Sequence, residues 1–195
     1  MAYEIAVVGT SWGGLAALRQ LVAALPDTFA LPLVVVQHRH RDSDHVLTSL
    51  LQDRTPLCVS EVEDKAPITG GTIYLAPADY HLLVEDGHFS LSTDEAVAFS
   101  RPSIDVTFTS IADAYGKRTI GVVLTGANND GARGLRRIAD RGGLPLVQRP
   151  ETAESATMPA AALRAVPEAR ALSIAQIAST LASLSVAQTS RSGST

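Results

Sequence analysis

A glycine-rich stretch near the N-terminus, Gly9–Gly14, contains a candidate nucleophile. It reads Gly-Thr-Ser-Trp-Gly-Gly and lies between the apolar run Ile5–Val8 and the helical pattern of Leu15–Val22. A buried strand that turns tightly into a helix would place Ser11 at the carboxyl edge of a sheet. The free N–H groups of the first helical turn would then point at whatever the serine attacks. The spacing G-x-S-x-G is that of a nucleophile elbow.

Two other interpretations of this stretch stay open. A serine at the start of a helix is often only its N-cap. A glycine-rich turn after a first strand can also hold a dinucleotide. That fingerprint requires glycine where Ser11 stands and an acidic residue about 20 positions on. The second apolar run instead ends in Gln37-His38.

Two more polar residues, His38 and Asp130, follow predicted buried strands. His38 ends the apolar run 31–37, and Asp130 lies in the loop after the predicted strand 119–124. In a doubly wound sheet, ligands bind at the carboxyl ends of the strands, where the strand order reverses. If strand 119–124 crosses to the other side of the first strand, the two residues converge on Ser11. The chemistry then fits a serine hydrolase, in which His38 takes the hydroxyl proton and Asp130 fixes the imidazole tautomer.

Each of these residues also has a simpler structural interpretation. His38 could bond a backbone carbonyl at a strand end, and Asp130 could cap the helix that follows it. Trp12 could be a hydrophobic lid or a substrate contact, and burial against the helix is an equal alternative. We interpret Cys58, on a short predicted strand, as a core residue rather than a nucleophile.

The loop after the second strand is rich in groups that bind metals. It contains His38, His40, Asp42, Asp44 and His45. Catalytic zinc sites usually draw their ligands from helices or strands at definite spacing, which this loop lacks. We therefore interpret His40 and His45 as solvated loop residues and predict no metal.

The rest of the chain alternates between predicted strands and helices. Strands are expected at 3–8, 31–37, 57–59, 72–76, 119–124, 144–148 and 171–172, and helices at 13–24, from Ser43 or Asp44 to 51, at 103–115, from 132 to Gly142-Gly143, and at 158–166 and 173–184. Two alternating runs joined by Asp86-Gly87 predict an antiparallel hairpin near residues 80–92. The expected fold class is α/β, with a doubly wound, mostly parallel sheet and helices on both faces.

Length and composition indicate one globular domain. The 195 residues are 46% hydrophobic and 18% charged, and the net charge of −4 gives no footprint for nucleic acid or a membrane surface. With one cysteine, no signal peptide and no long apolar run, the chain is expected in the cytoplasm. We expect a single domain over residues 1–187 and a disordered tail over 188–195.

An ordered set of motifs resembles the catalytic domain of the chemotaxis protein-glutamate methylesterase family, CheB. The motifs are Gly9–Gly14, Gln37-His38, Gly71–Pro77, Arg101-Pro102-Ser103-Ile104-Asp105-Val106, Leu124-Thr125-Gly126, Asn129-Asp130-Gly131-Ala132, Gly142-Gly143 and Met158-Pro159. They cover nearly everything from Ile5 to about Val166. An ordered set of this length is far more specific than any single motif.

The resemblance implies a doubly wound α/β enzyme that hydrolyses methyl esters on receptor glutamates and also deamidates certain glutamines. It implies Ser11 as nucleophile, His38 as base and Asp130 as its partner, with an oxyanion site built from the N–H groups of Trp12 and Ala127. No metal or organic cofactor is implied. The implied partners are methylated chemoreceptor helices or another methylated protein. The alternative function is a non-catalytic module that holds a glutamyl side chain or a partner helix in the same cleft.

The sequence departs from the family pattern at three points. Trp12 is bulky where members often carry a small residue or threonine, and it could narrow the substrate entrance. Methionine and glycine are common where Ala127 and Asn128 stand, and we interpret Asn128 and Asn129 as turn residues. The chain starts just before the first predicted strand, so no receiver domain is expected. It is then either a fragment or a stand-alone esterase that is regulated in trans or not at all.

Overall fold

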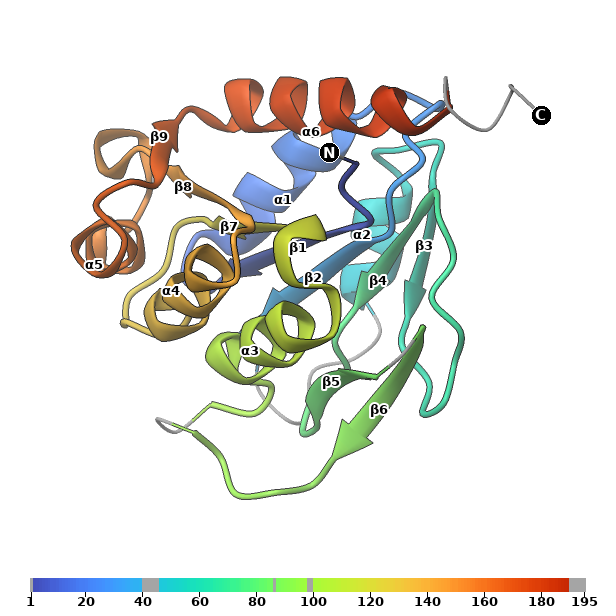
Figure 1. Cartoon of the computed structure of the whole chain (residues 1–195), viewed down its shortest axis with the longest axis horizontal. Helices are drawn as coiled ribbons and strands as arrows, with labels where there is room; N and C mark the ends of the chain where they lie inside the picture. Colours follow the sequence, from blue (N-terminus) through green and yellow to red (C-terminus); the bar gives the residue numbers. More distant parts are fainter. Residues whose placement is uncertain (1, 40–45, 86, 98–99, 190–195) are drawn as a thin grey trace.

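A seven-stranded parallel sheet forms the centre of the computed structural model, which describes residues 2–39, 46–85, 87–97 and 100–189 (Figure 1). The strand order is β3-β4-β2-β1-β7-β8-β9, and every neighbouring pair is parallel. The strands are β1 Ile5–Thr10, β2 Leu33–Gln37, β3 Cys58–Glu61, β4 Thr72–Leu75, β7 Thr119–Val123, β8 Leu144–Gln148 and β9 Arg170–Leu172.

A separate antiparallel pair, β5 His81–Glu85 and β6 His88–Ser92, lies beside the parallel sheet. It confirms the predicted hairpin and its position in the chain. Asp86, in the predicted turn of this hairpin, lies outside the described residues.

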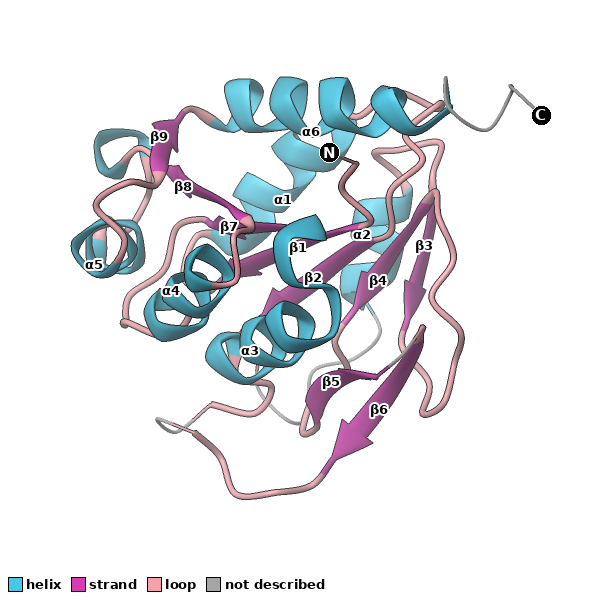
Figure 2. Cartoon of the chain, viewed as in Figure 1, coloured by secondary structure: helices cyan, strands magenta, loops and turns pink. Residues whose placement is uncertain are grey.

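Helices cover both faces of the sheet (Figure 2). They are α1 Gly14–Ala23, α2 Val46–Gln52, α3 Ile104–Tyr115, α4 Ala132–Asp140, α5 Thr157–Ala165 and α6 Ile174–Thr189, with short 3-10 helices at Gly116–Arg118 and Pro150–Thr152. Side chains of α1, α2 and α6 pack on one face, and those of α3, α4, α5 and the hairpin pack on the other. This arrangement is the predicted doubly wound α/β class.

Two hydrophobic cores form because successive side chains of a strand point to opposite faces of the sheet. In β1, Ala6 and Val8 belong to the core that contains α1 and α6. Ile5 and Val7 belong to the core that contains α3 and α4. A strand that is buried on both faces is apolar at nearly every position, and β1 and β2 therefore begin in the sequence as the unbroken apolar runs Ile5–Val8 and Leu33–Val36.

The prediction that Cys58 belongs to the core is wrong. Its side chain is exposed. β3 is an edge strand, and the alternation of side chains puts Val59 in the core while Cys58 faces the other way. A short apolar triplet does not reveal that its strand lies at the edge of the sheet.

The C-terminal helix is longer than predicted. α6 continues to Thr189, so Gln188 and Thr189 extend the helix rather than belonging to a disordered tail. Residues 190–195 lie outside the described residues, as do the predicted helix-capping residues Ser43 and Asp44. Within the described ranges, no helix is both long and apolar enough to cross a membrane.

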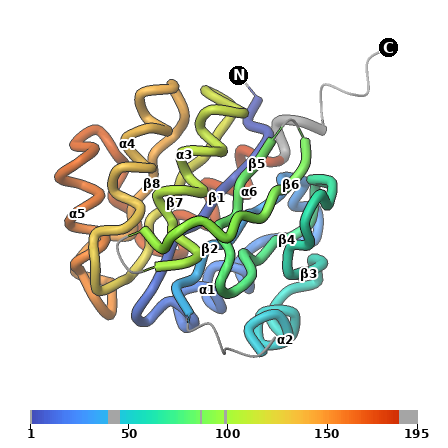
Figure 3. Tube along the Cα trace, turned by 90° about the horizontal axis from the view of Figure 1, so that it is seen from below, coloured from blue at the N-terminus to red at the C-terminus, as the bar shows by residue number. Residues whose placement is uncertain are grey.

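β1 lies at the switch point of the sheet, between β2 and β7 (Figure 3). Gly9 pairs with Val36 of β2 on one side and with Val123 of β7 on the other. The chain therefore crosses the sheet at β7, which is the condition on which the predicted convergence of the three residues depended. The three loops that follow these strands contain Ser11, His38 and Asp130, and they meet at one edge of the sheet.

Candidate active site

Ser11 lies in the turn between β1 and α1. The helix begins at Gly14 and its N-cap is Gly13, so Ser11 is not the helix cap. Gly13 has a φ of 75°, a left-handed conformation that favours glycine. The Ser11 N–H donates to the carbonyl of Thr125 at 3.0 Å, and the Ser11 carbonyl accepts from Gly14 N–H at 2.9 Å. The backbone of the turn is thus satisfied, while the hydroxyl takes no part in capping.

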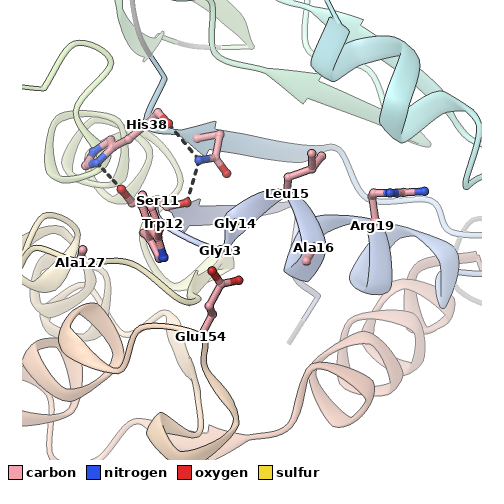
Figure 4. A pocket seen from close by; sticks show the side chains of 11 residues that line it. Ser11, Trp12, Gly13, Gly14, Leu15, Ala16, Arg19, His38, Ala127 and Glu154 are labelled. Atoms are coloured by element: carbon pink, nitrogen blue, oxygen red, sulfur yellow. Dashed lines mark hydrogen bonds between the residues drawn. The ribbon is translucent and has the colours of Figure 1, made fainter.

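His38 lies between Ser11 and Asp130. Its Nδ1 is 3.2 Å from Ser11 Oγ (Figure 4), and its Nε2 is 2.7 Å from Asp130 Oδ2. The imidazole is 12% exposed, and the His38 N–H donates to the carbonyl of Thr10 at 3.1 Å. The structure therefore brings together the three side chains that the sequence predicted to meet.

The Asp130 carboxylate is 1% exposed and accepts four hydrogen bonds. The donors are His38, the hydroxyl of Ser103, and the backbone N–H groups of Ile104 and Asp105 at the start of α3. Burial alone would raise the pKa of Asp130, but the hydrogen bonds from His38 and from the two N–H groups hold it below its usual value. A charged carboxylate here keeps the imidazole proton on Nε2, so that the Nδ1 lone pair faces the serine hydroxyl.

Asp130 does not cap the helix that follows it. The N-cap of α4 is Gly131, which makes no side-chain cap bond. Asp105 performs the capping from a different helix, because its Oδ1 accepts from the N–H groups of Gly131 at 2.9 Å and Gly134 at 2.7 Å. Its Oδ2 accepts from Arg133 Nε at 3.0 Å. Asp105 belongs to a motif of the family resemblance, but no capping role was predicted for it, because the helix that it caps begins more than 20 residues later in the sequence.

Gln37 ties the serine turn to the end of β2. Its Nε2 donates to the carbonyls of Ser11 and His38, both at 2.9 Å. A Cβ on Gly14 would lie 2.1 Å from Gln37 Oε1, so this close approach requires glycine. Gln37 belongs to the Gln37-His38 motif of the family resemblance, but no role for its side chain was predicted from the sequence.

Thr125, in the loop after β7, links the serine turn to two later segments. Its Oγ1 donates to the carbonyl of Trp12 at 2.9 Å and accepts from the N–H of Ser155, also at 2.9 Å. Its own N–H donates to Gln148 Oε1 at 2.9 Å, and its carbonyl accepts from the Ser11 N–H. The turn that carries the hydroxyl is therefore fixed to the loop that carries Asp130.

The side chain of Asn128 contacts both His38 and Asp130. Its Oδ1 accepts from the backbone N–H of Asp130 at 3.1 Å, and its Nδ2 is 3.3 Å from His38 Nδ1. From the sequence Asn128 was predicted only as a turn residue, because nothing in the sequence shows that its side chain reaches His38.

A pocket of about 590 Å³ opens beside Ser11 and His38 (Figure 4). It is lined by Ser11, Trp12, Gly13, Gly14, Leu15, Ala16, Arg19, Gln37, His38, Ala127 and Glu154. Trp12 is 66% exposed at this pocket, which excludes burial against the helix and leaves a lid or a substrate contact. Within the described ranges, the backbone N–H groups of Trp12 and Ala127 donate to no protein acceptor.

The loop after β2, whose composition could indicate a metal site, lies largely outside the described residues. Four of its candidate ligands, His40, Asp42, Asp44 and His45, are among the residues that are not described. In the part of the chain that the structure describes, no group of three or more histidine, cysteine, aspartate or glutamate side chains could hold a metal ion.

The fold and the site together define a class: a doubly wound α/β protein with a serine, a histidine and a buried carboxylate in hydrogen-bonded sequence at the switch point. The family model described as CheB methylesterase matches residues 6–181. The chain belongs to the CheB methylesterase family.

Relatives and a solved structure agree with this assignment. A protein of Leptospira interrogans, provisionally named protein-glutamate methylesterase/protein-glutamine glutaminase, is 45% identical over 179 residues, which cover 91% of this chain and 93% of that protein. A Carboxydothermus hydrogenoformans enzyme with the same activities in its name is 36% identical, over 92% of this chain and 54% of its own length. The crystal structure of the Thermotoga maritima CheB methylesterase catalytic domain matches with a TM-score of 0.88 and 31% identity, covering 94% of this chain and 100% of that one.

Proposed function

We propose that this chain is a protein-glutamate methylesterase, which hydrolyses γ-methyl esters of glutamate to glutamate and methanol. The observation that carries the proposal is the continuous hydrogen-bonded series from Ser11 through His38 to the buried Asp130. Membership of the CheB methylesterase family supports the substrate class. The names of relatives also include glutaminase activity, so hydrolysis of a glutamine side chain is part of the proposal.

In the proposed acylation step, Ser11 Oγ attacks the ester carbonyl while His38 Nδ1 takes its proton. Asp130 accepts from Nε2 and stabilises the imidazolium that forms. The free N–H groups of Trp12 and Ala127 donate to the oxyanion of the tetrahedral intermediate. The bond to the methoxy oxygen then breaks, and the Nδ1 proton passes to that oxygen and gives methanol.

In the proposed deacylation step, water takes the place of methanol. His38 Nδ1 accepts a proton from the water as its oxygen attacks the glutamyl-Ser11 ester. The bond to Ser11 Oγ breaks, the proton returns to the hydroxyl, and glutamate leaves. In both steps His38 Nδ1 therefore acts first as a base, when it accepts a proton, and then as an acid, when it donates that proton to the leaving oxygen.

The proposed protein substrates are methylated helices of chemoreceptor-type proteins in the cytoplasm. The pocket offers an exposed aromatic ring at Trp12, an apolar side chain at Leu15 and a cation at Arg19. These groups suit a glutamyl side chain carried on a protein surface. We also propose that a separate protein controls the access of substrate to this site.

Methanol release from methyl-labelled receptor membranes tests the proposal directly. Wild-type protein is expected to release methanol, and Ser11→Ala is expected to lose nearly all of this activity. The variant should keep its fold, because among the described residues the one hydrogen bond of the hydroxyl is with His38. An equal rate in the two proteins would contradict the assignment of Ser11. No release, with Ser11 unlabelled by a serine-directed inhibitor in a folded protein, would favour the non-catalytic module.

A further inference from the structure

Resting on the proposed function, we infer that Asn128 makes the site selective for ester over amide substrates. The side-chain amide of Asn128 has a fixed orientation. Asn128 Oδ1 accepts from the backbone N–H of Asp130 at 3.1 Å, a bond that the amide nitrogen cannot replace. This bond turns Nδ2 towards His38, where it lies 3.3 Å from Nδ1.

Two donors therefore share one lone pair in the resting site. The Ser11 hydroxyl is 3.2 Å from His38 Nδ1, on which the Nδ2 of Asn128 also converges. Because Asp130 binds Nε2 at 2.7 Å, the imidazole proton stays on that nitrogen and Nδ1 is the acceptor. The Asn128 amide is thus placed beside the one nitrogen that moves protons during the reaction.

When Nδ1 takes the serine proton, it becomes a donor, and Asn128 Nδ2 loses its acceptor. The next atom that must come within hydrogen-bond distance of Nδ1 is the leaving-group atom of the tetrahedral intermediate. That atom therefore also comes close to Asn128 Nδ2. The chemistry of the leaving atom decides whether Asn128 helps or hinders its departure.

A methoxy oxygen suits this position. It has two lone pairs, so it can take the proton from Nδ1 through one and accept a hydrogen bond from Asn128 through the other. The amine nitrogen of a glutamine intermediate has a single lone pair, which takes the proton. Its remaining N–H groups then face the N–H groups of Asn128, and no acceptor lies between them, because Oδ1 is held by Asp130.

The experiment measures kcat/KM for a peptide that carries a glutamate γ-methyl ester and for the same peptide with glutamine. Both substrates form the same glutamyl-Ser11 ester, so their ratio reports acylation alone. Asn128→Ala is expected to lower kcat/KM for the ester by about 3–10-fold, the loss of one neutral hydrogen bond, and to leave the amide value unchanged or higher. The ester-to-amide ratio should therefore fall by at least about 3–10-fold.

Two further variants separate specificity from loop structure. Asn128→Asp keeps an oxygen acceptor for the Asp130 N–H and replaces the N–H₂ donor by an acceptor, so the ratio should fall at least as far as in Asn128→Ala. Asn129→Ala removes an exposed amide from the same loop and should leave both values unchanged.

The outcomes distinguish this inference from the proposed function. Methanol release that depends on Ser11, with the same ester-to-amide ratio in wild type, Asn128→Ala and Asn128→Asp, would overturn the role of Asn128 alone. A parallel fall for both substrates in all Asn128 variants would also overturn it, in favour of a structural role. If wild type and Ser11→Ala release no methanol from the ester peptide, the proposed function falls, and this inference falls with it.

Discussion

Asp130 and Asp105 cap each other's helices. Asp130, which precedes α4, accepts hydrogen bonds from the start of α3, and Asp105, which lies in α3, accepts hydrogen bonds from the start of α4. Asp130 accepts from Ile104 and Asp105 in the first turn of α3, at 2.7 and 2.8 Å. Asp105 accepts from Gly131 and Gly134 at the start of α4, at 2.9 and 2.7 Å. Negative charge at a helix N-terminus is favourable, so the two carboxylates stabilise two helices and join them. The position of Asp130 against His38 therefore depends on how α3 packs against α4.

Asp130→Asn is expected to abolish most of the esterase activity. An amide at this position can donate to His38 Nε2 and so favours the tautomer with the proton on Nδ1, which cannot accept from Ser11. In a serine protease the corresponding change lowers kcat by about 10⁴-fold. Methanol release measured at saturating substrate tests this expectation. A loss of less than about tenfold in a folded variant would contradict the role of Asp130.

The pH dependence of stability should reveal the charge on Asp130. Its pKa is lower in the folded protein than in the unfolded chain, where aspartate titrates near about 3.9. The stabilisation is therefore complete above that value and is lost as the pH falls through the lower pKa of the folded state. Urea unfolding of wild type and Asp130→Asn should show a free-energy difference that narrows below about pH 4. A constant difference would contradict this linkage.

Asp105→Asn should weaken the protein by losing a charged acceptor at the start of α4. Hydrogen bonds to charged groups contribute about 1.5–3 kcal/mol each, and the Asp105 side chain is largely buried, at 9% exposed. We expect a loss of about 1.5–3 kcal/mol in the free energy of unfolding. Arg133→Ala is the matched control, because its side chain is 78% exposed and a surface ion pair contributes about 0–1 kcal/mol. Equal effects of the two variants would contradict the capping role of Asp105.

The sequence predicted the meeting of Ser11, His38 and Asp130 because each follows an unbroken apolar run. Such runs indicate strands buried on both faces of a parallel sheet, and the carboxyl ends of neighbouring parallel strands lie at one edge. Strand order was the only missing step, and the crossover at β7 supplies it. The fold class and the placement of the candidate site thus followed from local patterns.

The supporting contacts could not be predicted in the same way. Asp105, Thr125 and Asn128 act through hydrogen bonds to residues in other loops, and no spacing along the chain records such a pair. Cys58 was misplaced for a related reason, since its exposure depends on the edge position of β3. Patterns of burial are local, whereas the partners of a polar side chain are set by the packed fold.

Gly14→Ala should disrupt the serine turn. A Cβ there would lie 2.1 Å from Gln37 Oε1 and 2.7 Å from Thr10 Oγ1, so Gln37 would have to move. That movement breaks the bonds from Gln37 Nε2 to the carbonyls of Ser11 and His38. We expect kcat/KM to fall by at least about tenfold, in line with the cost of a misplaced nucleophile. Gly87→Ala, far from the serine turn, is the control for a general loss of stability: its Cβ would meet no atom within 4 Å, but its φ of 80° makes alanine strained there. Equal activity of both variants would contradict the prediction.

Trp12→Ala should raise KM more than it lowers kcat. The indole is 66% exposed at the pocket, so its loss removes contact area for substrate. The backbone N–H of residue 12 remains in the variant, and the proposed oxyanion site is retained. Stability should change by less than about 0.5 kcal/mol, as for other surface substitutions. A fall in kcat at unchanged KM would indicate that the indole contributes to the chemical step instead.

The exposed position of Trp12 also makes its intrinsic fluorescence a probe of the pocket. Trp12 is the one tryptophan in the chain, and it lies at the pocket that contains Ser11. Its emission therefore comes from this site alone, without a background from indoles elsewhere in the fold. A ligand that covers the ring would move it from water into a less polar environment, so binding should shift the emission maximum of Trp12 to shorter wavelength. Occupancy of the pocket could then be followed in real time, without a label and independently of turnover.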